Sequence, residues 1–262
     1  MLFRRWPSPF GVLTHLGLPT RCEVCGQWPS VPAGQAVCAD CVAQFTSTVH
    51  RCHTCALALP LPAIPLGAVG DCAQISTPLV CGACTLDPPP LNRCVAAWDY
   101  AYPWDRLIHR FKFQGDLAWA GGFAQALRQA PGAADCLAQA DWCLPIPLAL
   151  HRLGERGYNQ AWALTQALTR DQPHKARSDW LLKLADTPAQ HQLGRAERQH
   201  NLRTAFATAA HAQAALANRS VLLVDDIMTT GATLHAAALA LRRAGVARVD
   251  ALVLARTPPP GD

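Results

Sequence analysis

The most informative stretch of this 262-residue chain is Val221-Leu-Leu-Val-Asp225-Asp226-Ile-Met-Thr229-Thr230-Gly231-Ala-Thr233. Its four leading apolar residues predict a strand that is buried on both faces, which is typical of a parallel sheet. Two carboxylates follow at the end of that strand, and a hydroxyl-rich turn with one glycine then opens a helix. Because open α/β sheets bind ligands at the carboxyl ends of their strands, the stretch predicts a fold and a binding site together.

A phosphate monoester fits the turn that follows this strand. The helix N-terminus offers backbone N–H groups to an anion, the hydroxyls add donors, and the glycine permits a close approach. The residues that would bind this phosphate are Thr229, Thr230, Gly231, Ala232 and Thr233. Asp225 and Asp226 would accept hydrogen bonds from neighbouring hydroxyls of a sugar that carries the phosphate. The structural alternative makes both acids turn residues before a capped helix, but a site for an anion alone has no need of two adjacent carboxylates.

The part of the chain around this stretch shows the pattern of an α/β domain. From Val95 onward, apolar runs of strand length alternate with helical stretches, which indicates a mostly parallel sheet. We predict strands at Val95–Tyr100, Trp142–Ile146, Ser220–Asp225 and Arg248–Leu254. We predict helices at Trp104–Phe113, Leu117–Ala130, Asn159–Arg170, Arg195–Leu202 and Gly231–Ala244.

Cysteines dominate the first part of the chain, since ten of the twelve lie in residues 1–94. Eight of them form four C-x-x-C knuckles, which suit two closed tetrahedral zinc sites with a structural rather than a catalytic role. The predicted ligands are Cys22, Cys25, Cys38 and Cys41 in one site and Cys52, Cys55, Cys81 and Cys84 in the other. This sequential pairing is the simplest one; interleaved pairing stays open, and so do buried thiols or redox pairs. Cys72, His50 and His53 are competing ligands for the second site.

The composition is that of a globular protein. Hydrophobic residues make up 50% of the chain, charged residues make up 16%, and eight residues are Trp, which excludes a disordered or coiled-coil chain. No unbroken apolar run reaches the roughly 20 residues of a membrane span. Reduced cysteines in metal-binding spacing fit the cytoplasm, where we expect the protein to reside. The net charge of +5 is only mildly basic and assigns no partner by itself.

The stretch from Val221 to Thr233 resembles the signature of the type I phosphoribosyltransferases, which bind phosphoribosyl pyrophosphate (PRPP) with Mg²⁺. The resemblance implies their fold, a mostly parallel sheet flanked by helices. It also implies that Asp225 and Asp226 hold the ribose 2′ and 3′ hydroxyls and that residues 229–233 hold the 5′-phosphate. Purine-salvage members carry an acid at the position of Thr229, so a purine-salvage role is not expected.

Three further segments resemble one branch of these proteins, the competence-associated ComF/GntX family with its N-terminal double zinc ribbon. They are Leu107–Asp116 (L-I-x-x-[FL]-K-[FY]-x-G-D), Leu144–Gln160 (ending in R-G-[FY]-N-Q) and Gln190–Phe206 (Q-x-x-L…R-x-x-N…A-F). The resemblance implies a short segment at residues 1–20, a double zinc ribbon at 21–90 and a phosphoribosyltransferase domain at 91–262. It further implies a role in DNA uptake during natural transformation.

Pyrophosphate is strongly anionic and calls for arginine forks at the mouth of the sheet. We expect a loop after the strand that ends at Ile146, and we expect Arg152 and Arg156 on this loop to bind pyrophosphate. A solvated Arg-rich turn is the structural alternative. Asn159 and Gln160 are equally suited to cap the helix that follows.

The segment before the decisive strand offers candidates for a hood over the acceptor, namely Gln190, Arg198 and Asn201. The basic residues Lys183, Arg195, Arg198 and Arg203 would serve such a hood, a track for nucleic-acid phosphates, or a solvated helix face.

Two functions from different classes follow from these observations. The first is a Mg-PRPP-binding phosphoribosyltransferase whose acceptor the sequence does not name. The second is a non-catalytic protein that binds single-stranded DNA or uptake proteins, with PRPP as a regulatory ligand. For the second, Trp98, Tyr100, Trp104 and Phe113 interleave with Arg106, Arg110 and Lys112 in a way that suits base stacking, unless these rings belong to the core.

Overall fold

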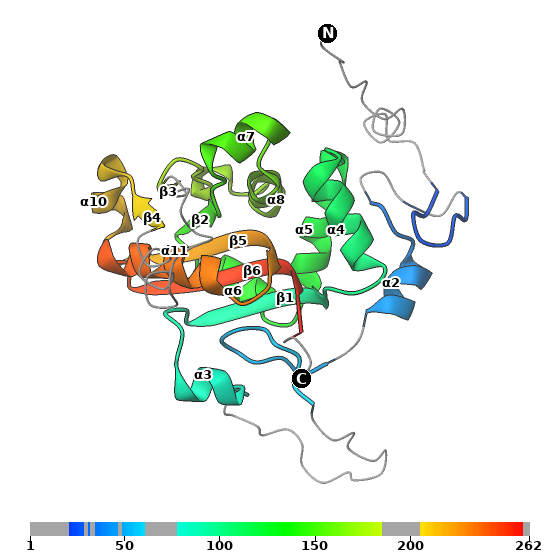
Figure 1. Ribbon diagram of the computed structural model, residues 1–262, viewed down its shortest axis with the longest axis horizontal. Helices are drawn as coiled ribbons and strands as arrows, with labels where there is room; N and C mark the ends of the chain where they lie inside the picture. The colour runs from blue at the N-terminus through cyan, green and yellow to red at the C-terminus, as the bar shows by residue number, and fades with distance from the viewer. Residues whose placement is uncertain are drawn as a thin grey trace, which may run out of the picture.

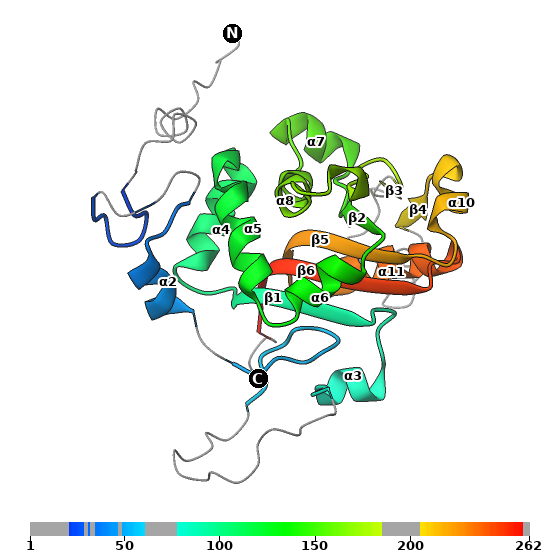
Figure 2. The ribbon, with the colours of Figure 1, turned by 180° about the vertical axis from the view of Figure 1, so that it is seen from behind.

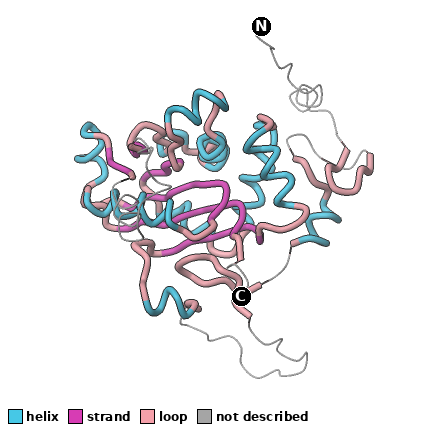
Figure 3. Tube along the Cα trace, viewed as in Figure 1, coloured by secondary structure: helices cyan, strands magenta, loops and turns pink. Residues whose placement is uncertain are grey.

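A four-stranded parallel sheet forms the centre of the molecule (Figures 1 and 3). The computed structural model describes residues 21–28, 31, 35–46, 49–60, 78–184 and 205–258. The strands are β1 (Arg93–Asp99), β2 (Trp142–Pro145), β5 (Ser220–Met228) and β6 (Arg248–Arg256), in the order β1-β6-β5-β2. All three neighbouring pairs are parallel, so the carboxyl ends of the strands meet at one edge.

Alternate residues of β5 face two different hydrophobic cores, as expected for a strand that is buried on both faces. Leu222 and Val224 face the core that is shared with the helices α4, α5, α6 and α8. Val221 and Leu223 face the core on the opposite side, which contains α11. These helices span Trp104–Phe113 (α4), Ala120–Gln129 (α5), Ala133–Gln139 (α6), Gln160–Leu168 (α8) and Ala232–Arg243 (α11).

Shorter elements surround this central unit. The helices are α2 (Ala39–Phe45), α3 (Gly82–Leu86), α7 (Leu150–Arg156) and α10 (Gln213–Leu216), and the 3-10 turns are η2 (Leu117–Trp119), η3 (Pro173–Lys175) and η4 (Ala210–Ala212). The strands β3 (Leu181–Lys183) and β4 (Phe206–Thr208) form a separate antiparallel pair. Both views of the ribbon show α4, α5 and α8 on one side of the sheet, and α3 with the loop at residues 49–60 on the other (Figures 1 and 2).

The structure confirms the predicted α/β class and the predicted helix Trp104–Phe113, but it moves several boundaries. β5 continues to Met228 rather than ending at Asp225, because β6 stays paired with it through the register Met228↔Arg256. The predicted helix Leu117–Ala130 is a 3-10 turn followed by α5. The predicted helix Arg195–Leu202 lies outside the described residues.

The segment after β2 corrects a second expectation. The sequence predicts a loop that presents Arg152 and Arg156, but these residues lie on the short helix α7, which ends at Gly157 with φ +76°. No residue of α7 is buried. Packing therefore contributes little to this helix, which explains why the hydrophobic pattern did not reveal it.

Candidate functional site

The two adjacent acids lie in the C-terminal half of the strand β5, just beyond the last residue that pairs with β2. Asp226 is 2% exposed and Asp225 is half-buried. Each carboxylate accepts a hydrogen bond from the next backbone N–H: Asp226 N lies 2.9 Å from Asp225 Oδ1, and Ile227 N lies 2.8 Å from Asp226 Oδ1. Both side chains are thereby fixed at the carboxyl edge of the sheet, where α/β proteins bind ligands.

Asp226 is held by two side chains from distant segments. Lys112 Nζ, at the end of α4, lies 3.2 Å from Asp226 Oδ1 and 3.0 Å from Oδ2. Gln160 Nε2, at the start of α8, donates to Asp226 Oδ2 at 2.9 Å. Sequence patterns alone assigned Lys112 and Gln160 no role at the acid pair, although each residue lies in a segment that carries the family resemblance. The motifs around them were the only sequence feature that could have marked these residues as candidates for the site, and it is the fold that shows both side chains contacting one carboxylate.

Further hydrogen bonds join the segments that carry Lys112 and Gln160. Tyr158 Oη accepts from Gly115 N at 2.9 Å and donates to Phe111 O at 3.3 Å. Asn159 Oδ1 accepts from the first backbone N–H groups of α8, while its Nδ2 donates to Ile146 O at 3.0 Å. Of the two residues predicted to cap α8, Asn159 does so and Gln160 turns to the acid instead.

The electrostatics of the pair favour a ligand that tolerates or neutralises negative charge. Burial first, and then the charge of Asp226, raise the pKa of the Asp225 carboxyl well above its ordinary value. The ammonium group of Lys112 opposes this effect but does not cancel it. Asp225 is therefore the member of the pair that gains most from a hydroxyl donor or a cation.

The turn after β5, residues 229–233, is called the phosphate loop below. Thr229, Thr230 and Thr233 are exposed. Gly231 has φ +84°, a backbone conformation that side-chain-bearing residues rarely adopt, so the turn requires glycine here; a Cβ would also displace the terminal methyl group of Met228, which would lie 2.6 Å from it. Gly231 is the N-cap residue and has no side chain that could cap α11. Ala232 N donates to Thr230 Oγ1 at 3.3 Å, and a helix N-terminus offers its other first-turn N–H groups to an anion.

The two arginines predicted to bind pyrophosphate occupy one face of α7, four residues apart. Arg152 is exposed, whereas Arg156 is half-buried and stacks over the ring of Phe113 at 4.5 Å. Arg156 Nη1 is buried and has no hydrogen-bond partner among the described residues. Gln160 Oε1 is likewise buried without a described partner, and the Nε2 of the same side chain contacts Asp226.

The predicted residues of the acceptor hood, Gln190, Arg198 and Asn201, lie outside the described residues.

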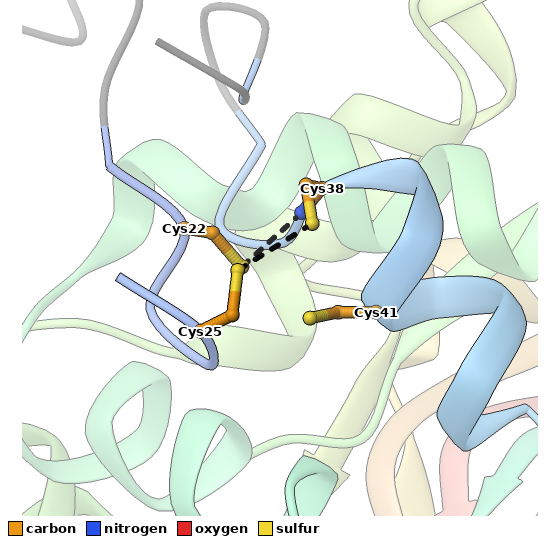
Figure 4. Close-up of side chains that lie close together, drawn as sticks. All are labelled: Cys22, Cys25, Cys38 and Cys41. Carbon is orange, nitrogen blue, oxygen red and sulfur yellow. Dashed lines mark hydrogen bonds between the residues drawn. The ribbon is translucent and has the colours of Figure 1, made fainter. Parts of the chain in front are cut away.

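The eight knuckle cysteines form two groups, and each group brings four sulfur atoms within 4.8 Å of one another. The first cysteine cluster contains Cys22, Cys25, Cys38 and Cys41, whose side chains point toward one another (Figure 4). The second cysteine cluster contains Cys52, Cys55, Cys81 and Cys84. The structure thus has the sequential pairing.

Both clusters are built in the same way. In the first, Cys38 N donates to Cys22 Sγ at 3.4 Å; in the second, Cys81 N donates to Cys52 Sγ at 3.3 Å. The residue after each first knuckle is left-handed, with φ +72° at Gly26 and +56° at Ala56. Ala56 therefore adopts the backbone conformation for which a ribbon knuckle usually has glycine.

The sulfur geometry fits a tetrahedral metal ion. A Zn–S bond of about 2.3 Å implies sulfur–sulfur edges of about 3.8 Å. The sulfurs of Cys25 and Cys38 are 3.8 Å apart, and those of Cys55 and Cys81 are 3.7 Å apart. No disulfide is found among the described cysteines.

The acidity of the thiols also points to a cation. Burial raises the pKa of Cys22, but backbone N–H groups outweigh burial and bring the pKa to about 6. The same balance brings the pKa of Cys52 to about 7. Burial and the neighbouring thiols raise the pKa values of Cys41 and Cys84. Four thiolates at this spacing can all ionise only when a divalent cation neutralises them.

Two of the four rings considered for base stacking belong to the core. Trp98 and Trp104 are 5% and 3% exposed and stack on each other at 3.9 Å in the core. Arg110 pairs with Glu23 at 2.5 Å and with Asp116, and Lys112 pairs with Asp226. Arg110, Lys112 and the two tryptophans are therefore engaged within the molecule, whereas Phe113 is 49% exposed and Arg106 is also exposed.

Every helix that the structure describes is too short or too polar to cross a bilayer.

Residues 183–260 match the sequence model of the phosphoribosyl transferase domain. The matched range contains the acid pair, the phosphate loop and the helix α11. The comparison thus places β5, the phosphate loop and α11 within a recognised domain type, whereas Lys112, Arg152, Arg156 and Gln160 precede the matched range.

Relatives extend the similarity over most of the chain. The DNA utilization protein YhgH of Escherichia coli (strain K12) is 33% identical over 198 residues, which make up 71% of this chain and 84% of that protein. The protein of the same name from Salmonella typhimurium is 29% identical over 249 residues, 92% of this chain and 99% of that protein. Competence protein F of Haemophilus influenzae is 34% identical over 180 residues, 67% of this chain and 78% of that protein.

Proposed function

This chain belongs to the ComF family of competence and DNA-utilization proteins, and from that premise we propose that it binds Mg-PRPP at the carboxyl edge of its sheet in the service of DNA uptake. The DNA-related role follows from the names of the relatives. The PRPP site rests on the residues of β5 and the phosphate loop.

One observation carries the proposal: Asp225, a half-buried acid with a raised pKa, lies six residues before the glycine N-cap of α11, and the turn between them carries exposed threonines. The phosphate loop suits the 5′-phosphate, because Gly231 permits close approach and α11 presents its N-terminus. Asp225 suits the ribose hydroxyls, whose hydrogen bonds would stabilise its carboxylate. Asp226 is already engaged by Lys112 and Gln160, so we assign Asp225 the direct contact and Asp226 a shared one.

Arg152 and Arg156 are the proposed pyrophosphate ligands. The buried, unpartnered Nη1 of Arg156 is a donor in need of an acceptor, which a pyrophosphate oxygen would provide. When bound, Mg²⁺ supplies charge neutralisation to the pyrophosphate oxygens. If the protein turns over, the bond from ribose C1 to pyrophosphate breaks and an acceptor nucleophile bonds to C1, while the arginines stabilise the departing anion.

Zinc is the proposed metal of both cysteine clusters. Four thiolates close the tetrahedron and leave no position for a substrate, so the role is structural. The chemistry that we propose therefore belongs to the sheet edge alone.

Calorimetric titration with Mg-PRPP tests the proposed site. We expect the wild type to bind and Asp225→Asn to lose at least tenfold in affinity, because the amide cannot replace a carboxylate that accepts two hydroxyls. Asp135→Asn is the matched control, since Asp135 is an exposed acid whose partner Arg93 begins β1 at the opposite edge. A folded wild type without PRPP affinity, or equal affinity in Asp225→Asn, would contradict the proposal.

The non-catalytic alternative is separated by a second titration, with single-stranded DNA at several salt concentrations. A steep salt dependence with no pyrophosphate release for any acceptor would favour a binding protein with PRPP as its regulatory ligand. Release of pyrophosphate with a nucleoside base or DNA would favour the transferase.

A further inference from the structure

A single buried arginine joins the phosphate loop to the second cysteine cluster. Arg256 is the last residue of β6 and is 8% exposed. Its Nε donates to the carbonyl oxygen of Cys55 at 3.0 Å, and its Nη1 donates to the carbonyl oxygen of Met228 at 3.2 Å. Nη1 also donates to the carbonyl oxygens of Thr229 and Thr257. One guanidinium therefore holds a cysteine ligand on one side and the first residue of the phosphate loop on the other.

Other contacts between the second cluster and the sheet reinforce this arrangement. Cys94 N, in β1, donates to the carbonyl oxygen of His53 at 2.9 Å, between the two cysteines of the knuckle. Cys94 Sγ lies 3.7 Å from Met228 Sδ, just before the phosphate loop. Cys52, Cys55 and Cys81 belong to the same buried core as Met228. Both ribbon views place the loop at residues 49–60 beside the end of β6 (Figures 1 and 2).

The first cysteine cluster is attached elsewhere. Its segment contacts α4 through the ion pair of Glu23 with Arg110 and through Trp104 Nε1, which donates to Phe45 O at 3.0 Å. Its buried cysteines belong to the core on the other face of the sheet. Among the described residues, the hydrogen bonds of its four cysteines stay within residues 22–45.

The charge of Arg256 gives the link a physical basis. A buried guanidinium needs compensation, and no described carboxylate pairs with Arg256; the partners are backbone carbonyls. Four thiolates around one divalent cation carry two formal negative charges, and Cys55 is one of those thiolates. A filled second cluster would therefore supply the opposing charge on one side of Arg256, and a bound phosphate would supply it on the other.

We propose that Arg256 is a positioning residue that makes the phosphate loop depend on the second cysteine cluster and not on the first. Metal in the second cluster fixes the carbonyl of Cys55, Arg256 transmits this position to Met228 and Thr229, and the loop is held ready for a phosphate. This inference rests on the proposed function for the identity of the ligand. The ordering of the loop is a separate consequence that needs no ligand.

Hydrogen–deuterium exchange of the peptide at residues 226–235 measures that ordering directly. Arg256→Lys keeps the charge but cannot reach both carbonyls, so we expect faster exchange in this peptide and a loss of PRPP affinity on the order of tenfold. Two metal ions per chain and cooperative unfolding should persist. Glu23→Gln is the matched control, because it removes the corresponding link of the first cluster; its exchange and affinity should equal those of the wild type.

A pair of ligand substitutions keeps the test valid if Arg256→Lys fails to fold. Cys84→Ser replaces a half-buried cysteine of the second cluster, and Cys25→Ser replaces an exposed cysteine of the first cluster. We expect only Cys84→Ser to speed exchange at residues 226–235. Equal exchange in both cysteine variants, or a loop as protected in Arg256→Lys as in the wild type, would overturn the inference. Absence of PRPP binding to the wild type would instead contradict the proposed function and leave the exchange result to decide the link.

Discussion

The two adjacent acids of β5 have opposite relations to stability. Asp225 carries a pKa raised by burial and by Asp226, so its ionised form is disfavoured in the folded chain. Asp226 instead has two partners from distant segments, the ammonium group of Lys112 and the side-chain amide of Gln160. One acid is thus available for a ligand at a cost in stability, whereas the other holds three segments of the chain together.

Asp225→Asn is expected to raise the melting temperature at pH 7 by a few degrees. A carboxyl with a raised folded pKa contributes stability that is fully present below its ordinary pKa of 3.8 and is lost as pH rises through the folded value. The amide is neutral at every pH, so the gain of the variant should shrink as the pH falls toward 4. Calorimetric scans across this range measure the effect, and a gain that does not vary with pH would contradict the assignment.

Asp226→Asn is expected to do the reverse. It leaves Lys112 without its carboxylate, and breaking a buried pair costs about 3 kcal/mol, which is lessened here because the side chain of Lys112 is 24% exposed. The melting temperature should therefore fall by several degrees. Denaturant unfolding of this variant beside Asp225→Asn compares the two acids directly, and shifts of equal sign would refute their different roles.

Lys112 should set the pH range over which PRPP binds. Its positive charge lowers the pKa of Asp225 against burial, so Lys112→Met raises that pKa further and moves the rise of affinity with pH to higher pH. Lys112→Arg retains the charge and should keep the midpoint of the wild type. Affinity measured at half-unit steps of pH tests this; a purely structural lysine would lower affinity in Lys112→Met at every pH without moving the midpoint.

The junction between β5 and α11 depends on glycine at one position. Gly231→Ala places a Cβ 2.6 Å from Met228 Cε at φ +84°, and the left-handed conformation alone costs about 1–2 kcal/mol. We expect a lower melting temperature and weaker PRPP binding. Gly121→Ala is the contrasting control, since Gly121 lies in α5 and its added Cβ would meet only Arg170 Nη2 at 3.7 Å; this variant should gain up to about 1 kcal/mol.

Local sequence predicted the elements whose pattern is strong and missed those that depend on distant partners. The strand β5, its two acids and the glycine turn could be predicted because all the residues that define them lie within thirteen consecutive positions. The contacts of Lys112 and Gln160 with Asp226 could not be predicted, because these residues are 114 and 66 positions away from the acid in the sequence. α7 was missed because it has no buried face.

The cysteine part shows the same limit. Knuckle spacing predicted both four-cysteine sets, and the structure brings them together in that pairing. The spacing could not show that the two clusters pack on opposite faces of the sheet. Arg256, which joins the second cluster to the phosphate loop, stands 201 residues from Cys55, so no motif contains both.

The division of the chain at residue 90 is a prediction that truncation can test. The second cysteine cluster shares its core with β1, β5 and α11, and Arg51 pairs with Asp99 of β1 at 2.7 Å. A chain that begins at residue 91 would expose this core face, and each large apolar side chain brought into water costs about 1.5–3 kcal/mol.

We therefore expect residues 91–262 to lack a cooperative thermal transition. A chain that begins at residue 49 retains the second cluster and the contact of Arg256 with Cys55, so it should unfold cooperatively in the presence of zinc, at a lower temperature than the full chain. Calorimetry of the three chains, each with its metal content measured, gives the comparison. If residues 91–262 unfold cooperatively and bind PRPP, the sheet is complete without the cysteine clusters. If residues 91–262 do not unfold cooperatively but residues 49–262 do, the second cluster is part of the phosphoribosyltransferase unit and only the first cluster is separable from it.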